Sequence, residues 1–182
     1  MAMAATIPYY TVEEMERFPR DGNRYELLDG VLLVTPAPSY AHQAVATVLA
    51  MKLALEVQGR GIARVLAPGA VAVPPRTQLE PDVLVVPLRF ALNSQWQDIT
   101  EHWLAVEILS RSSRMYDREF KRDAYLQLGV REVWLVDLAD RSVEVSRLPG
   151  ASKTVRDTLA WQVPAHDLEV QIQLAEVFAG LE

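Results

Sequence analysis

The chain has 182 residues, of which 50% are hydrophobic and 23% are charged, as expected for one globular domain. It contains no cysteine, which excludes disulfides and cysteine-based metal sites or nucleophiles. The net charge of −6 counts against a strong general affinity for nucleic acid, but it permits an acidic cleft that holds a metal. Neither a signal peptide nor an apolar membrane span is evident, so we expect a cytoplasmic protein without a membrane partner.

A short helix and a β-hairpin are predicted first along the chain. The segment Thr11-Val-Glu-Glu14 has the spacing of a capping box, and the helix that it begins should end before Pro19. Residues 24–34 contain two apolar runs separated by Asp29-Gly30. This dipeptide between apolar runs strongly indicates a two-residue hairpin turn.

A long helix and a series of strands follow. Ser39 is a typical N-cap for a helix over residues 40–58, which carries an apolar stripe. The later elements are predicted from apolar runs and turn residues: strands over residues 62–73, 82–87, 104–109, 132–137 and 143–148, a helix from Ser112 or Ser113 to about Leu128, and a strand and short helix from Leu168 and Leu174. This order of elements predicts an α/β fold with a mixed central sheet flanked by helices and an N-terminal hairpin.

Glu107 is the most informative residue, because it interrupts the apolar strand Trp-Leu-Ala-Val-Glu-Ile-Leu-Ser. Burying an unpaired carboxylate is very costly, so this group should be paired, neutral or bound to a metal. Two alternatives stay open at this point: a glutamate on the open face of an edge strand, and a glutamate that is ion-paired with an arginine.

Asp82 and Lys121 are weaker candidates when each is taken alone. Asp82 follows Pro81 at the start of a strand, where ligands often bind in α/β sheets, but a residue there also commonly caps a turn. Lys121 lies one helical turn after Asp117 and one turn before Tyr125, and alone it would be interpreted as a surface partner of Asp117. Together, two carboxylates on neighbouring strands form a hard-oxygen site suited to Mg²⁺ or Mn²⁺, beside an ammonium that can stabilise phosphate charge.

Several segments resemble the PD-(D/E)XK nuclease superfamily, and within it a bacterial family of restriction-endonuclease-like proteins that is largely uncharacterised. The segments are Pro81-Asp82, Val106–Ser110, Tyr116–Tyr125, Gly129–Trp134 and Val136-Asp137, together with Tyr25–Gly30 and the helix start Ser39–His42. The resemblance covers roughly residues 10–150. It implies a single restriction-endonuclease-like domain over residues 1–182.

The resemblance also implies a divalent metal, Mg²⁺ or Mn²⁺, held by Asp82 and Glu107, with the backbone carbonyl of Ile108 as a further ligand. The usual superfamily motif has a lysine two positions after the second acid, where this chain has Leu109. The family resemblance places the lysine on the following helix instead, and Lys121 matches that position.

Three further residues are assigned from the same resemblance or from their positions. Glu26 matches an early acid of the family and is predicted to be a metal ligand or a base, although a surface glutamate beside the hairpin is nearly as well supported. Tyr125 is predicted either to hydrogen-bond into the site or to pack between helix and sheet. His42 is close enough to the start of its helix to approach a phosphate, but a structural histidine is the favoured interpretation.

The function that the sequence favours is a metal-dependent endonuclease that hydrolyses phosphodiester bonds in DNA. Its predicted catalytic residues are Asp82, Glu107, Lys121, Glu26 and Tyr125. The alternative is a catalytically inactive nuclease-fold protein for binding or assembly, which the acidic net charge and the displaced lysine motivate. Hydrolysis of RNA or of another phosphate ester also stays open. A homodimer follows from the resemblance, because many nucleases of this fold cut both strands as dimers.

Overall fold

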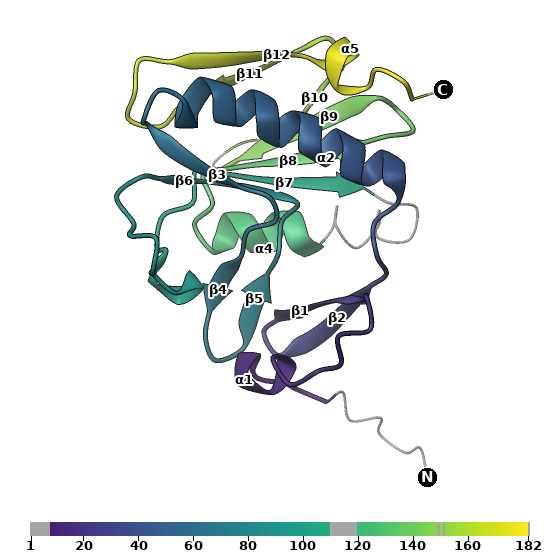
Figure 1. Cartoon of the computed structure of the whole chain (residues 1–182), viewed down its shortest axis with the longest axis vertical. Coiled ribbons are helices and arrows are strands. Elements are labelled where there is room, and N and C mark those ends of the chain that lie inside the picture. The colour runs from purple at the N-terminus through teal and green to yellow at the C-terminus, as the bar shows by residue number, and fades with distance from the viewer. Residues whose placement is uncertain (1–7, 110–119, 149, 151, 182) are drawn as a thin grey trace.

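The structure is a computed structural model that describes residues 8–109, 120–148, 150 and 152–181 (Figure 1). A mixed central sheet forms its middle layer, and its strands in the described residues are β3 (Ala63–Leu66), β6 (Val83–Pro87), β7 (Leu104–Leu109), β8 (Glu132–Asp137), β9 (Ser142–Arg147) and β10 (Lys153–Val155). The strand order is β10-β9-β8-β7-β6-β3, with β7 and β8 parallel and the other neighbours antiparallel.

In the part of the chain that the structure describes, two smaller β structures accompany the central sheet. One is a sheet in the order β2-β1-β5-β4, whose strands are β1 (Arg24–Leu28), β2 (Val31–Thr35), β4 (Val71–Val73) and β5 (Thr77–Leu79). The other is an antiparallel hairpin of β11 (Thr158–Gln162) and β12 (Glu169–Gln173).

Helices cover both faces of the central sheet. The helices among the described residues are α1 (Val12–Met15), which lies beside β1 of the small sheet, α2 (Tyr40–Leu53), its π-helical continuation η1 (Ala54–Gln58), the 3-10 turn η2 (Trp96–Asp98), α4 (Arg122–Gln127) and α5 (Leu174–Val177). Figure 1 shows α2, α5 and the β11–β12 hairpin on one side of the sheet and α4 on the other. Among the described residues, no helix has the length and apolar character that a membrane crossing requires.

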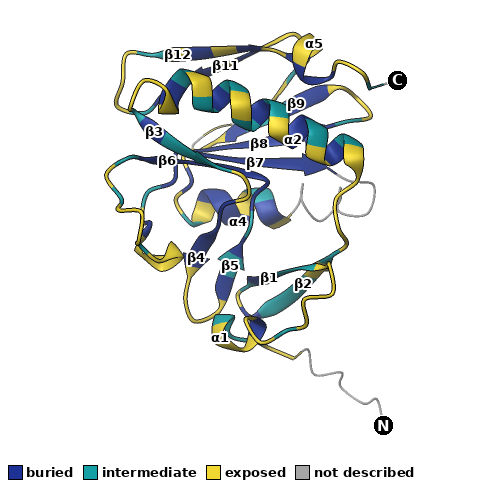
Figure 2. Ribbon diagram, in the orientation of Figure 1, coloured by how far each residue is buried: buried dark blue, intermediate teal, exposed yellow. Residues whose placement is uncertain are grey.

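The central strands are buried on both faces, as Figure 2 shows for β7 and β8. Side chains alternate between the faces of a strand, so Val83 and Val85 pack beneath α2 whereas Leu84 and Val86 belong to the core on the α4 side. This double burial explains why these strands are apolar at nearly every position.

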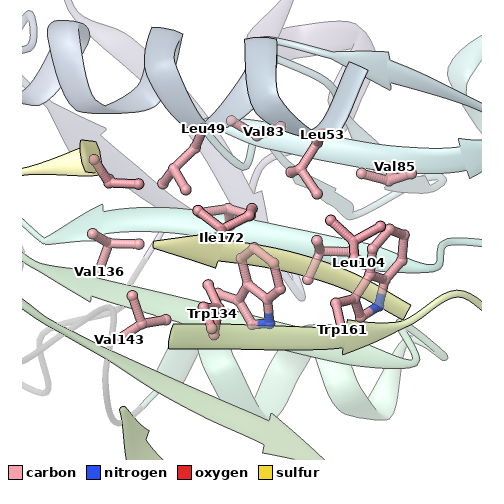
Figure 3. Packing of buried hydrophobic residues seen from close by; sticks show 14 of the residues in the cluster. Leu49, Leu53, Val83, Val85, Leu104, Trp134, Val136, Val143, Trp161 and Ile172 are labelled. Atoms are coloured by element: carbon pink, nitrogen blue, oxygen red, sulfur yellow. The ribbon is translucent and has the colours of Figure 1, made fainter. Parts of the chain in front are cut away.

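The core beneath α2 also joins the C-terminal hairpin to the central sheet. Trp134 of β8 meets Trp161 of β11 edge to face, with ring centroids 6.4 Å apart (Figure 3). Leu49 and Leu53 of α2 reach the same cluster, and both are fully buried. One apolar layer therefore fixes α2 and the β11–β12 hairpin against the same face.

The predicted α/β fold is confirmed, and so are the hairpin and the long helix. Asp29 and Gly30 both have positive φ, 50° and 84°, as a two-residue hairpin turn requires. The capping box of Thr11 and Glu14 is present, and Ser39 caps α2 by accepting from the backbone N–H of His42.

The single strand predicted over residues 62–73 is wrong. The chain forms β3 in the central sheet and then β4 in the small sheet, and β5 was not predicted. Gly69 lies between β3 and β4 and passes so close to β6 that an added Cβ would sit 2.6 Å from the Cβ of Leu84. The apolar pattern does not reveal this change of sheet, because both strands are apolar.

The packing of Trp161 gives a testable expectation for stability. The substitution Trp161→Ala should lower the free energy of unfolding by about 3–5 kcal/mol, because it leaves a cavity between β11 and β8. Trp96→Ala is the matched control: Trp96 is 39% exposed, and its loss should cost only about 0.5 kcal/mol. Urea unfolding followed by circular dichroism measures both, and equal losses would contradict the assigned packing.

Candidate active site

Asp82 and Glu107 lie on adjacent strand segments and on the same face of the central sheet. β6 and β7 pair with Val83 opposite Val106, and continuing this register places Asp82 opposite Glu107. Glu107 lies two residues after Ala105 and therefore on the same face of β7, the side of the sheet that α4 covers. Both carboxylates are buried, with exposed fractions of 5% for Asp82 and 3% for Glu107.

Lys121 joins Glu107 to Glu26 of the small sheet. Its Nζ lies 2.5 Å from Oε1 of Glu107 and 2.9 Å from Oε1 of Glu26. Only 3% of Lys121 and 1% of Glu26 are exposed. Loss of Lys121 would remove the cation that both buried carboxylates share, so the burial of the two acids depends on this lysine.

Tyr125 fixes the other side of Glu107. Its hydroxyl donates to Oε1 of Glu107 at 2.7 Å, and its ring is fully buried. Burial, followed by the charges of Glu107 and Glu26, raises the pKa of Tyr125 well above its ordinary value. The phenol therefore keeps its proton and acts as a hydrogen-bond donor to the carboxylate.

Glu26 is held by the backbone as well as by lysine. Its Oε1 accepts from the backbone N–H of Glu80 at 2.7 Å, at the point where the chain leaves β5 for β6. Burial and the charge of Glu26 raise the pKa of the Glu80 carboxyl above its ordinary value. The alternative prediction, that Glu26 is a surface residue beside the hairpin, is wrong because the side chain is buried.

Asp82 is surrounded by three donors from different parts of the fold. Arg24 of β1 donates to Oδ1 at 3.0 Å, and the Ile108 backbone N–H donates to Oδ2 at 2.8 Å. Nε2 of His42, in the first turn of α2, lies 3.1 Å from the same Oδ2. Burial by itself would raise the pKa of Asp82, but His42, Arg24 and the Ile108 N–H together lower it below its ordinary value.

The structure thus brings together Glu26, Asp82, Glu107, Lys121 and Tyr125, although their chemical roles stay predictions. β7 is an interior strand of the central sheet, so Glu107 does not lie on an edge strand. The alternative partner of Lys121, Asp117, lies outside the described residues, as do Ser112 and Ser113.

Arg24 is the part of the site that the sequence analysis missed. Burial lowers the pKa of Arg24, but the negative charges of Asp82 and Glu107 outweigh this effect and raise the pKa above its ordinary value. The guanidinium is therefore a permanent cation. Arg24 precedes Glu26 by two residues on one strand, and strand alternation puts both on the same face. That spacing could have identified it once Glu26 was assigned to the site.

His42 contacts the site through one nitrogen only. Within the described residues, its buried Nδ1 has no hydrogen-bond partner. The favoured interpretation of His42 as a structural histidine did not include the contact between its Nε2 and Asp82.

Among the described residues, no group of three or more His, Asp or Glu side chains is arranged to enclose a metal ion.

The fold and this buried cluster of acids and lysine define a restriction-endonuclease-like protein. A family model described as "Putative restriction endonuclease" matches residues 12–182, and the chain belongs to this family, Uma2. Membership is consistent with the PD-(D/E)XK resemblance of the sequence.

A solved structure agrees with the family assignment at the level of the fold. It is described as a putative nuclease belonging to DUF820 from Anabaena variabilis ATCC 29413, and it matches with a TM-score of 0.77. The two chains share 19% identity over 94% of this chain and 99% of the other. No curated protein matches this sequence.

The lowered pKa of Asp82 predicts a pH dependence of stability. A carboxyl whose pKa is lower in the folded state contributes stability above its unfolded pKa of about 3.9, and that contribution is lost as the pH falls through the folded pKa. Asp82→Asn should therefore be less stable than the wild type at pH 7, and the difference should shrink between about pH 4 and pH 2. Urea unfolding at several pH values measures this, and a constant difference would show that the pKa of Asp82 is not lowered.

Proposed function

We propose that this chain is an endonuclease that uses a divalent metal, Mg²⁺ or Mn²⁺, to hydrolyse phosphodiester bonds in DNA. The observation that carries this function is the burial of Glu26, Asp82 and Glu107 together with Lys121 in one cluster. Membership of a family described as restriction endonucleases supports nuclease chemistry, and DNA is the substrate that this description implies.

The residues present fit a hard divalent cation. Three buried carboxylates, those of Glu26, Asp82 and Glu107, gather in one cluster and supply hard oxygen atoms, the ligand type that such cations prefer. Mg²⁺ commonly takes one or two carboxylates and completes its shell with water and phosphate oxygens. Asp82 and Glu107 would hold the ion, with the carbonyl of Ile108 as a further ligand. When bound, the ion would polarise a phosphoryl oxygen and lower the pKa of a bound water.

The chain's own groups would orient the reactants and stabilise charge. Lys121 has an ammonium with three N–H donors, and Glu26 and Glu107 fix its place in the cluster. There it can stabilise the negative charge that develops on the phosphate, in a site where burial strengthens electrostatic interactions. Tyr125 holds the Glu107 carboxylate in one orientation by donating to Oε1.

The proposal also includes the state of the protein: a homodimer of one-domain subunits in the cytoplasm. A symmetric dimer would supply two such sites, one for each strand of a duplex. Light scattering coupled to gel filtration would report the oligomeric state.

A second candidate function is a binding or assembly protein without catalysis. Both oxygens of Asp82 already accept hydrogen bonds from the chain, and this observation favours a site that is complete without metal. Calorimetry with Mn²⁺ separates the two functions. Binding that disappears in Asp82→Asn supports the endonuclease, and no heat from the wild type up to millimolar metal supports the binding protein.

Loss of either predicted metal ligand should abolish cleavage. Asp82→Asn and Glu107→Gln should each lower the rate of plasmid nicking in Mn²⁺ by about 100-fold or more, because metal stabilisation of the transition state is worth several kcal/mol. Glu169→Gln, at an exposed position on β12, is the control and should cleave like the wild type. Equal rates for the wild type and Asp82→Asn would refute the assignment.

Lys121 should affect the chemical step more than metal binding. Lys121→Met should lower cleavage by about 100-fold, the usual effect of removing one charge-stabilising group, while Mn²⁺ binding persists. The variant also leaves Glu26 and Glu107 without their shared cation, which destabilises the fold by about 3–5 kcal/mol. The double variant Lys121→Met with Glu26→Gln removes one buried charge of each sign, and it should be more stable than the single variant Lys121→Met. If the folded double variant cleaves at the wild-type rate, Lys121 is not catalytic.

A further inference from the structure

The two oxygens of Asp82 have different kinds of partners. Oδ2 accepts from the Ile108 backbone N–H at 2.8 Å and lies 3.1 Å from Nε2 of His42. Both donors are buried and belong to regular elements, β7 and α2. A carboxylate oxygen has about two lone pairs, so Oδ2 is saturated by donors that the fold holds in place.

Oδ1, in contrast, has one donor in the contacts observed, and that donor is a long side chain. Arg24 reaches Oδ1 at 3.0 Å while also donating to the backbone carbonyl of Glu80 at 3.2 Å. The side chain of Arg24 is 23% exposed, against 3% for Asp82. The guanidinium therefore lies at the solvent side of the ion pair, where it can move without disturbing the core.

From this asymmetry we propose that Arg24 is a placeholder cation that competes with the divalent metal for Oδ1 of Asp82. His42 and the Ile108 N–H keep Oδ2 fixed in both states, so that Oδ1 points to the metal position. This inference rests on the proposed metal-dependent function and assigns a role to Arg24 and His42 within the same site.

The physical basis is the balance of charge in a buried site. Without metal, Arg24 and Lys121 offset part of the negative charge of Glu26, Asp82 and Glu107, and burying these acids without cations would be very costly. With metal, the same guanidinium repels the incoming cation. Arg24 thus stabilises the metal-free protein and weakens metal binding.

Two variants that touch the same carboxylate should shift metal affinity in opposite directions. Arg24→Gln should lower the Kd for Mn²⁺ by about fivefold or more, the effect of one unit charge at contact distance even with water-like screening. His42→Ala should raise the Kd by about tenfold, as is usual when a partner that orients a metal ligand is lost. Arg24→Lys keeps the charge, and its Kd should stay within about twofold of the wild type.

The decisive experiment is calorimetric titration of each variant with Mn²⁺, with Asp82→Asn as the reference without binding. General damage to the fold would weaken binding in both Arg24→Gln and His42→Ala, so tighter binding by Arg24→Gln alone supports the placeholder. Unchanged or weaker binding by Arg24→Gln, with the wild type still binding through Asp82, overturns this inference and leaves the proposed function standing. No binding by the wild type would instead refute the proposed function itself.

Thermal unfolding provides a second measurement that does not depend on accurate affinities. In chelator, Arg24→Gln should have a lower Tm than the wild type, because Asp82 has lost its cation. In saturating Mn²⁺ the difference should become smaller, because ligand binding stabilises the tighter-binding variant more. A difference that is the same with and without Mn²⁺ would contradict competition between Arg24 and the metal.

Discussion

The arrangement of the candidate site depends on one buried ammonium. Lys121 lies between Glu26 and Glu107 with only 3% of its surface exposed, and each of the three groups would be costly to bury alone. Because these residues come from the N-cap of α4, from β1 and from β7, their ion pairs connect three separate parts of the fold. The small sheet is thereby attached to the central sheet by charge as well as by apolar contact.

The position of the small sheet follows from this connection. The hairpin of β1 and β2 pairs with β5, and the chain passes from β5 directly into β6 through Glu80 and Asp82. The Glu80 N–H binds Glu26, and Arg24 binds Asp82, so both contacts cross from the hairpin to the start of β6. The hairpin therefore supplies one acid and one cation to a site whose other acids come from β6 and β7.

The sequence was informative where a residue conflicts with its local surroundings. Glu107 stood out because an apolar strand cannot bury a carboxylate without a partner, and Asp29-Gly30 stood out because few dipeptides adopt two positive φ angles. Arg24 was missed for the opposite reason: an arginine at the start of a strand is ordinary, and its contact with Asp82 spans 58 positions of sequence. Such long-range pairings depend on how the sheets meet, which local patterns do not encode.

The position of the lysine has a structural reason as well. A lysine in the usual place, two residues after the second acid, would replace Leu109, which lies on the same face of β7 as Glu107 and is 3% exposed within an apolar cluster. An ammonium there would be surrounded by hydrocarbon rather than by the acids of Glu26 and Glu107. From the helix that covers this face, Lys121 approaches both carboxylates at the edge of the same cluster. The geometry therefore allows an apolar residue in the strand and a cation beside the acids at the same time.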